Sequence, residues 1–264
     1  MVTTPRRTLL RAAALAPAAL TTLAACDSGG QSDQSSHESV TARRTASASP
    51  ASAPASPTPA AGEDALPFHL HTGPRTTHAV ALTFHGQGDP AVATALLAEA
   101  ERAGARLTVL AVGSWLDAQP QMAHRILSGG HELGNHTQHH IDISSLPAPR
   151  AYAEIADCAS RLHRLTGSIG RWFRPSQATD CTTTVAAQAA RVGYRHCLGY
   201  DVDSLDYTDP GPDAVVRTVL QKARPGSIVS MHFGHSGTVT ALPRILDGLH
   251  QRGLRAVTTT ELFK

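Results

Sequence analysis

Hydrophobic and polar positions follow two alternating periods along the chain from about residue 66 onward. Short runs of apolar and β-branched residues indicate strands, whereas apolar residues three and four positions apart indicate amphipathic helices. Strands are predicted at residues 78–84, 106–112, 131–133, 172–173, 196–202, 226–232 and 254–257. Helices are predicted at residues 90–103, 120–128, 149–166, 183–192, 212–223 and 239–251.

This repeated strand–helix order predicts an α/β fold in which a parallel sheet is covered by helices. About seven strands in roughly 200 residues favour a distorted, incomplete (β/α) barrel over an open sheet with helices on both faces. In such barrels the chemistry lies on the loops that follow the carboxyl ends of the strands. Unusual polar residues gather at those ends: His85, the segment 135–140, Arg174, the segment 203–206 and His232.

The first 65 residues have a different composition, which predicts export and anchoring rather than a fold. Residues 1–26 resemble a signal peptide: Arg6 and Arg7 precede an apolar run that ends in a lipobox-like Leu-Ala-Ala before Cys26. The paired arginines also resemble a twin-arginine signal. An ordinary signal peptide with a chance cysteine is the alternative. Residues 27–65, rich in Ser, Ala and Pro, predict a disordered tether, and residues 66–264 the catalytic domain.

These features predict an exported protein that is lipid-anchored through Cys26 to the outer face of the cytoplasmic membrane. The formal net charge of +2 is too small to indicate a nucleic-acid partner. Oligomeric state leaves no signal in the sequence. The cysteines beyond the signal peptide, Cys158, Cys181 and Cys197, are odd in number and allow at most one disulfide among them.

Histidine is the unusual residue type, with 15 copies. His136 and His140 are four positions apart, so a helical turn would place both imidazoles on one face, where they could share a metal ion. A histidine-rich surface loop is the alternative interpretation of this pair.

Four further segments occur in a fixed order around that pair. They are Phe173-Arg174-Pro175, Asp203 with Asp206 and Tyr207, the apolar run 228–231 that ends in His232, and Thr83-Phe84 at the end of the first long strand. In this order the chain resembles the NodB-like polysaccharide deacetylases, carbohydrate esterase family 4. That family has five such motifs, and their counterparts here run from Thr83 to His232.

The resemblance implies a divalent metal, for which zinc is expected, held by His136 and His140. It implies that His232 is the general acid and that Arg174 and Asp206 form a pair that orients the catalytic groups. A purely structural salt bridge between these two residues is the alternative. Backbone N–H groups after Pro175 could stabilise the oxyanion.

The first motif departs from the family, which has Thr-Phe-Asp-Asp-Gly. Here His85 replaces the family's base and Gly86 replaces its metal-binding carboxylate. Three outcomes follow: His85 is the third metal ligand, or it is the base while water or Asp89 completes the metal shell, or the site is inactive. Gly86 is expected to leave room for the His85 side chain. The third motif also departs, with Ser176-Gln177 in place of Pro-Tyr.

The expected function is metal-dependent removal of N-acetyl groups from cell-envelope polysaccharide, such as peptidoglycan or chitin-like oligomers. An inactive glycan-binding lipoprotein is the alternative from another class, supported by the missing carboxylates. Amide hydrolysis on a small molecule is a third possibility, because the shape of the loops, rather than the motifs, determines which substrate enters.

Overall fold

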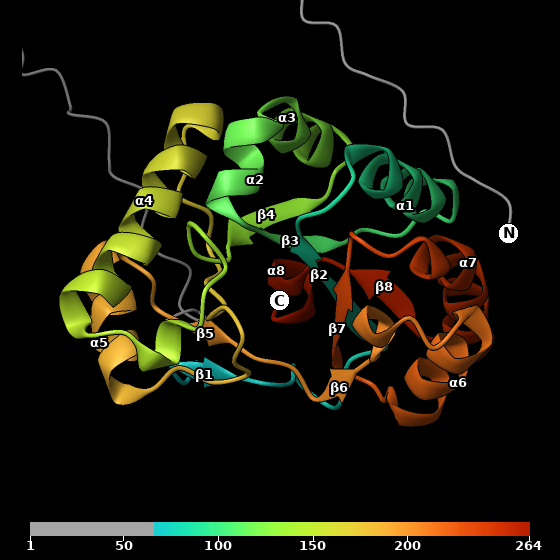
Figure 1. Ribbon diagram of the computed structural model, residues 1–264. Coiled ribbons are helices and arrows are strands. Elements are labelled where there is room, and N and C mark those ends of the chain that lie inside the picture. Colours follow the sequence, from blue (N-terminus) through green and yellow to red (C-terminus); the bar gives the residue numbers. More distant parts are fainter. Residues whose placement is uncertain (1–65) are drawn as a thin grey trace, which may run out of the picture. The chain divides into compact units, whose positions relative to one another are not determined.

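A computed structural model describes residues 66–264 (Figure 1). The expected signal peptide, Cys26 and the tether lie outside the described residues. The strands are β1 His69–Leu70, β2 Ala79–Gly86, β3 Thr108–Ala111, β4 Glu132–Asn135, β5 Cys197–Leu198, β6 Val202–Asp203, β7 Ile228–His232 and β8 Arg255–Val257. The α-helices are α1 Pro90–Arg102, α2 Gly113–Ala118, α3 Gln121–Ser128, α4 Ala148–Thr166, α5 Thr183–Val192, α6 Pro212–Lys222, α7 Ser236–Gln251 and α8 Thr259–Leu262. Among these described helices, none is both long and apolar enough to cross a membrane.

The strands form an incomplete barrel, as predicted. Their order is β4-β3-β2-β7-β6, with β8 beside the first half of β2 and a separate β1-β5 pair, and every one of these pairs is parallel. Phe173 bridges Asn135 on one side and Cys197 on the other, which connects β4 to the β1-β5 pair. The longer helices lie around the outside of the strands (Figure 1).

Strand β2 is central, and all its residues are buried. Alternate side chains point to opposite faces of a strand. Val80, Leu82 and Phe84 accordingly join the core beneath the outer helices. Ala79 and Ala81 face inward and pack with Leu262 of α8, which plugs the interior (Figure 1). Thr83 and His85 continue this inward row toward the carboxyl end of β2, so alternation alone directs His85 into the barrel mouth.

Several element boundaries differ from the sequence prediction. Helix α2 precedes α3 and was not predicted. Its six residues are too few to show a helical period. The strand predicted at 196–202 is two short strands, β5 and β6, and residues 172–173 contribute an isolated bridge. The two-residue β1 and the short α8, closed by a capping box between Thr258 and Glu261, were also not predicted.

Candidate metal and catalytic site

Two neighbouring strand ends provide the centre of the site. In the parallel pairing of β2 with β7, His85 is the register partner of His232, and Thr83 is the partner of Ser230. The imidazole centroids of His85 and His232 are 4.3 Å apart. The His85 ring Nε2 is 3.1 Å from the Ser230 hydroxyl. The fold therefore brings the altered first motif and the fifth motif side by side.

His136 and His140 follow β4, but not on a helical turn as predicted. The segment is an irregular loop, in which Thr137 and His140 have positive φ angles of 68° and 56°. Asn135 supports the loop, since its side-chain Oδ1 accepts a hydrogen bond from the Thr137 N–H at 2.8 Å. The two imidazoles still converge, with ring centroids 4.8 Å apart. The backbone turn, rather than helical spacing, brings them together.

His85 completes a cluster of three histidines with His136 and His140. One ring nitrogen from each lies within 4.8 Å of the others, and His136 and His85 are buried. The Nδ1 of His136 is 3.0 Å from the Arg174 carbonyl oxygen, which accepts only if Nδ1 carries the proton. Its Nε2 is then a lone-pair donor, and this buried atom has no hydrogen-bond partner among the described residues.

These imidazoles are in the protonation state that metal binding requires. Burial, with a further contribution from the charge of His136 and of Arg174, lowers the pKa of His85 well below its ordinary value. Burial also lowers the pKa of His136 strongly and that of His140 to a lesser degree. Neutral imidazole is a common zinc ligand. A buried, unpaired Nε2 in a group of three neutral histidines fits a divalent metal.

Asp206 and His232 form the second part of the site. Asp206 Oδ1 lies 2.7 Å from His232 Nδ1, and its Oδ2 accepts from the His232 backbone N–H at 2.9 Å. The hydroxyls of Ser204 and Thr238 donate to the same carboxylate. Burial alone would raise the pKa of Asp206, but its hydrogen bonds and the charge of His232 outweigh burial and lower it. The carboxylate thus stays ionised and fixes the His232 ring.

Arg174 does not pair with Asp206, contrary to the sequence prediction. Its Nε donates to the Leu198 carbonyl at 2.8 Å, and its Nη2 donates to Thr83 Oγ1 and to the Gly199 carbonyl. The side chain is fully buried, and its Nη1 has no partner among the described residues. Burial lowers the pKa of Arg174 to about 10. Strand order explains the difference, because Arg174 follows Phe173, which bridges Asn135 of β4 and Cys197 of β5, so its donors meet carbonyls at the end of β5 and Thr83 of β2.

The sequence prediction that Gly86 leaves room for the His85 side chain is wrong. A Cβ at position 86 would lie 2.8 Å from Val109 Cγ1 and 3.0 Å from the Ala111 Cα, so the glycine faces the packed strand β3. Asp89 caps α1 by accepting from the Ala91 N–H at 2.8 Å, and it is not part of the three-histidine cluster. The carboxyl end of β2 and the segment up to Asp89 therefore contribute one side chain to the centre, the imidazole of His85.

A cavity of about 390 Å³ opens over these groups. It is lined mostly by polar and aromatic residues, which come from β2, β6, β7 and the loops between the strands: His85, His140, Gln177, Ala178, Thr179, Tyr200, Asp203, Tyr207, Ser230 and His232. Tyr207, in place of the family's tryptophan, is 46% exposed and packs edge-on against His232. A half-exposed aromatic ring beside hydroxyl and carboxylate groups suits a sugar, which has both apolar faces and hydroxyls.

Some residues of the site were not predicted from the sequence. Ser230 lies two positions before His232 and therefore on the same strand face, a signal the sequence did contain. Ser176 accepts from the Thr137 hydroxyl and donates to the Ile141 carbonyl, and Gln177 donates to the His140 carbonyl. Ser176 and Gln177, which differ from the family's third motif, thus hold residues 136–140 in place, and we call this segment the histidine loop. These contacts join residues far apart in sequence, and no local pattern indicates them.

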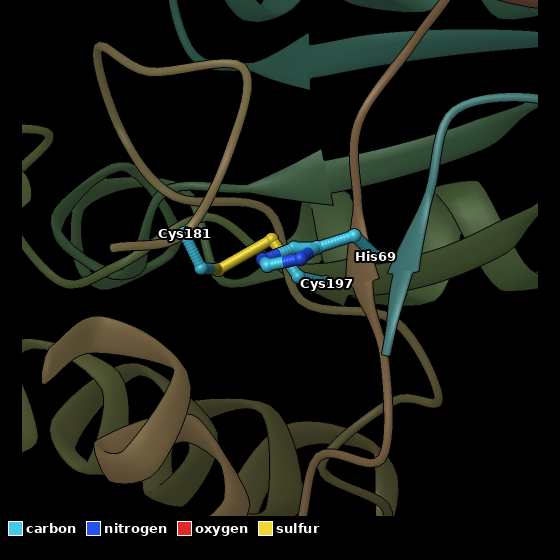
Figure 2. Close-up of side chains that lie close together, drawn as sticks. All are labelled: His69, Cys181 and Cys197. Carbon is cyan, nitrogen blue, oxygen red and sulfur yellow. A yellow bond between two sulfur atoms is a disulfide. The ribbon is translucent and has the colours of Figure 1, made fainter. Parts of the chain in front are cut away.

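A second group of potential metal donors lies at the β1-β5 edge, where His69 is close to Cys181 and Cys197 (Figure 2). The two sulfur atoms are joined in a disulfide, whereas a metal site would require free thiolates. Cys158 is the free, buried cysteine among the described residues, and burial raises its pKa to about 12. The single disulfide allowed by the odd cysteine count is therefore Cys181–Cys197.

Comparisons with known proteins identify the family of the chain. The polysaccharide deacetylase family matches residues 72–197. A peptidoglycan-N-acetylglucosamine deacetylase from Bacillus cereus is 29% identical over 197 residues, covering 72% of this chain and 91% of that protein. A chitooligosaccharide deacetylase from Sinorhizobium fredii is 30% identical over 211 residues, covering 70% and 93%.

Among solved structures, a mutant of a CE4 family pseudoenzyme, described as having restored enzymatic activity, matches with a TM-score of 0.72. It is 25% identical and covers 76% of this chain and 73% of its own. The wild-type pseudoenzyme is from Bacillus anthracis. From the shared fold, the shared motifs and these relatives, we conclude that the chain belongs to the polysaccharide deacetylase family, carbohydrate esterase family 4.

Proposed function

We propose that this protein is a metal-dependent deacetylase that removes N-acetyl groups from cell-envelope polysaccharide, with an all-histidine metal site. The observation that carries the proposal is the unpaired, buried Nε2 of His136 within 4.8 Å of ring nitrogens of His85 and His140. Residues His136, His140 and His85 would hold the ion, for which zinc suits the donor set. When bound, it would polarise the acetyl carbonyl and acidify a water molecule.

His232 is placed to give a proton to the leaving nitrogen. Asp206 accepts from its Nδ1 and so leaves Nε2 as the group that meets the cavity. An imidazole can hold a proton on this nitrogen and release it, as a general acid must. The neutral His85 beside it has the second role, either as a ligand or as a base that accepts the proton of water.

The relatives support the substrate class. The two curated relatives are named for peptidoglycan N-acetylglucosamine and for chitooligosaccharides, both N-acetylated glycans. The cavity is bordered by Tyr200 and Tyr207 and by the side chains of Asp203 and Ser230, and this mixture of aromatic and hydrogen-bonding groups suits a sugar unit of such a polymer. Metal content of the purified chain, followed by acetate release from N-acetylated oligomers, tests the proposal. A metal-free protein that releases no acetate with added zinc would contradict it.

A non-catalytic glycan-binding protein is the second candidate. It is favoured by the absence of both first-motif carboxylates, by the unpaired Nη1 of Arg174, and by the fold match to a CE4 family pseudoenzyme. The two candidates differ in one measurement. The binding protein would retain oligomers tightly and release no acetate at any metal concentration.

We further propose that the protein is exported and anchored by lipid on Cys26, as the lipobox-like sequence suggests. Cys26→Ser should release the protein from the membrane fraction or block its maturation. The measurement is the distribution of wild type and variant between membrane and soluble fractions. A wild type that is fully soluble after processing would show that Cys26 carries no lipid.

A further inference from the structure

We propose that Glu154 is a positioning residue for the metal site, because its carboxylate holds the backbone turn that presents His136 and His140. The inference rests on the proposed function, since it concerns the metal that these histidines would bind. Glu154 itself lies on α4, outside the cavity and outside all five motifs.

The position of Glu154 is unusual for a carboxylate. It lies on the buried face of α4, among Ala151, Ile155 and Cys158, and is 7% exposed. A buried carboxylate is costly unless hydrogen bonds replace its water. Its neighbours on the helix face are apolar, so the compensating donors must come from another part of the chain.

Those donors come from the histidine loop. Oε2 of Glu154 accepts from the backbone N–H groups of Gln138 and His139, at 3.1 and 2.8 Å. Oε1 is 2.7 Å from His139 Nδ1. Gln138 and His139 are two of the three residues that separate His136 from His140. The carboxylate is therefore bound to the backbone between the two ligands, and not only to a side chain at the surface.

The turn needs such support because its backbone is strained. Thr137 and His140 have φ angles of 68° and 56°, a region that residues with a Cβ seldom adopt unless their surroundings impose it. The N–H groups of Gly113 and Ser114 at the start of α2 donate to the Thr137 and Gln138 carbonyls. Glu154 accepts from the N–H groups on the other side. The turn is thus clamped between α2 and α4.

The alternative is that Glu154 only stabilises the packing of α4. The two roles predict different results for metal binding by folded protein. A positioning role lowers affinity and changes ligand geometry, since a relaxed turn moves one imidazole away from the other. A packing role lowers the melting temperature and leaves the affinity of the molecules that remain folded unchanged.

The test compares variants of the purified chain by competitive titration with Zn²⁺ and by the visible spectrum of bound Co²⁺, which reports ligand number and geometry. Glu154→Leu removes every acceptor and should lower affinity more than about tenfold. Glu154→Gln keeps one oxygen for the backbone donors and should lose about threefold. His139→Ala keeps both backbone hydrogen bonds and should stay within about twofold of wild type.

Gln188→Leu is the matched control, because it places leucine at another buried polar position, on α5, 7% exposed and hydrogen-bonded to Arg191. It should leave affinity and the Co²⁺ spectrum unchanged. Wild-type affinity and spectrum in folded Glu154→Leu would overturn the inference. If that variant does not fold, wild-type affinity in Glu154→Gln would overturn it, as would a loss in His139→Ala equal to that in Glu154→Gln.

The same measurements distinguish a failure of the proposed function from a failure of the inference about Glu154. A wild type that binds neither Zn²⁺ nor Co²⁺ would overturn both the metal-dependent function and the inference. A wild type that binds metal and releases acetate, with affinity that does not respond to Glu154, would overturn the inference alone.

Discussion

The two halves of the site differ in how their charges are balanced. In the Asp206–His232 half, an ionised carboxylate accepts four hydrogen bonds, and every oxygen has a partner. In the His85–Arg174 half, a buried guanidinium lies close to a neutral imidazole and has one nitrogen without a partner. The family has a carboxylate where His85 stands. The protein therefore lacks the family's carboxylate in the His85–Arg174 half and keeps the acidic and histidine residues, Asp206 and His232, in the other.

Histidine at position 85 changes the charge of the site. Removing negative charge while keeping Arg174 leaves the centre more positive, and burial of His85 in its neutral form limits the excess. An ion held by neutral imidazoles keeps more of its positive charge, which favours ionisation of bound water. The His85–Arg174 half is thus compatible with hydrolysis by a different charge balance.

The largest expected effect is loss of the metal. His136→Ala combined with His140→Ala removes two of three donors, so the purified chain should fall from about one divalent ion per molecule to none. Elemental analysis of the purified protein measures it. His139→Ala is the matched control, since its ring lies on the outer side of the loop, 59% exposed, and bonds Glu154. Equal metal content in the double variant and the wild type would show that His136 and His140 do not hold the metal.

Substitutions in the Asp206–His232 half should lower the rate of acetate release without changing metal content. His232→Ala should lower the rate of acetate release by about 10²–10⁴-fold, the usual contribution of a general acid. Asp206→Asn should reduce the rate less, because the ring loses its ionised partner but not its position. Both variants should retain wild-type zinc content. A His232→Ala variant with full activity would exclude the ring as the acid.

A substitution at position 85 distinguishes the two roles proposed for His85, metal ligand and base. If His85 is a ligand, His85→Ala should lower metal affinity and activity together. If it is the base, metal should stay bound and only turnover should fall. Isothermal titration with zinc and an acetate assay on the same samples separate the two roles. A variant with wild-type affinity and wild-type rate would contradict both roles.

Restoring the family's two carboxylates should change stability by a smaller amount, and the two substitutions should act in opposite directions. His85→Asp gives the guanidinium of Arg174 a possible carboxylate partner, whereas Gly86→Asp must displace Val109 or Ala111 at a cost of about 1–3 kcal/mol. We therefore expect the double variant to be less stable than His85→Asp alone. Gain of acetate release would show an enzyme that has drifted, and no gain would show one rebuilt around imidazole. Urea unfolding measures the stability of each variant, and the acetate assay measures its activity.

The smallest effect is the pH dependence of stability in the metal-free protein, which should differ between the halves. His85 and His136 have lowered pKa values in the folded state, so below about pH 6.5 the unfolded chain binds protons that the folded chain does not. Stability should fall as pH drops from there. Asp206 also has a lowered pKa, but its contribution is lost only in acid, below about pH 4.

Thermal unfolding of the apo protein across pH 4–7 tests this, with the His136→Ala, His140→Ala double variant as control. The variant lacks the imidazoles of His136 and His140, whose pKa values burial lowers, and should lose less stability between about pH 6.5 and 5. A wild type whose melting temperature is flat over that range would show that these histidines are not buried in neutral form.

The pattern and motifs of the sequence predicted the family, the barrel and most of the groups at the site, but not the roles of Ser230 and Glu154. Strand alternation places Thr83 and His85 on one face of β2, and Pro90 after Asp89 marks the start of α1. Motif order identified His136, His140 and His232. The alternation and cap signals are local, because they depend on periods within a few residues, whereas motif order is a resemblance that extends from Thr83 to His232. The predicted signal peptide and lipid anchor are equally local, and they stay predictions.

Only the tertiary structure decided which groups meet. Whether Arg174 reaches Asp206 depends on strand order, and the barrel places Arg174 against Thr83 and the Leu198 carbonyl instead. Whether Gly86 leaves a space depends on Val109 of the adjacent strand. The clamp on the histidine loop joins Glu154 to residues 15 and 16 positions away. A periodic pattern shows which face a side chain takes, but packing between distant segments sets its partner, and that partner determines its charge and its chemistry.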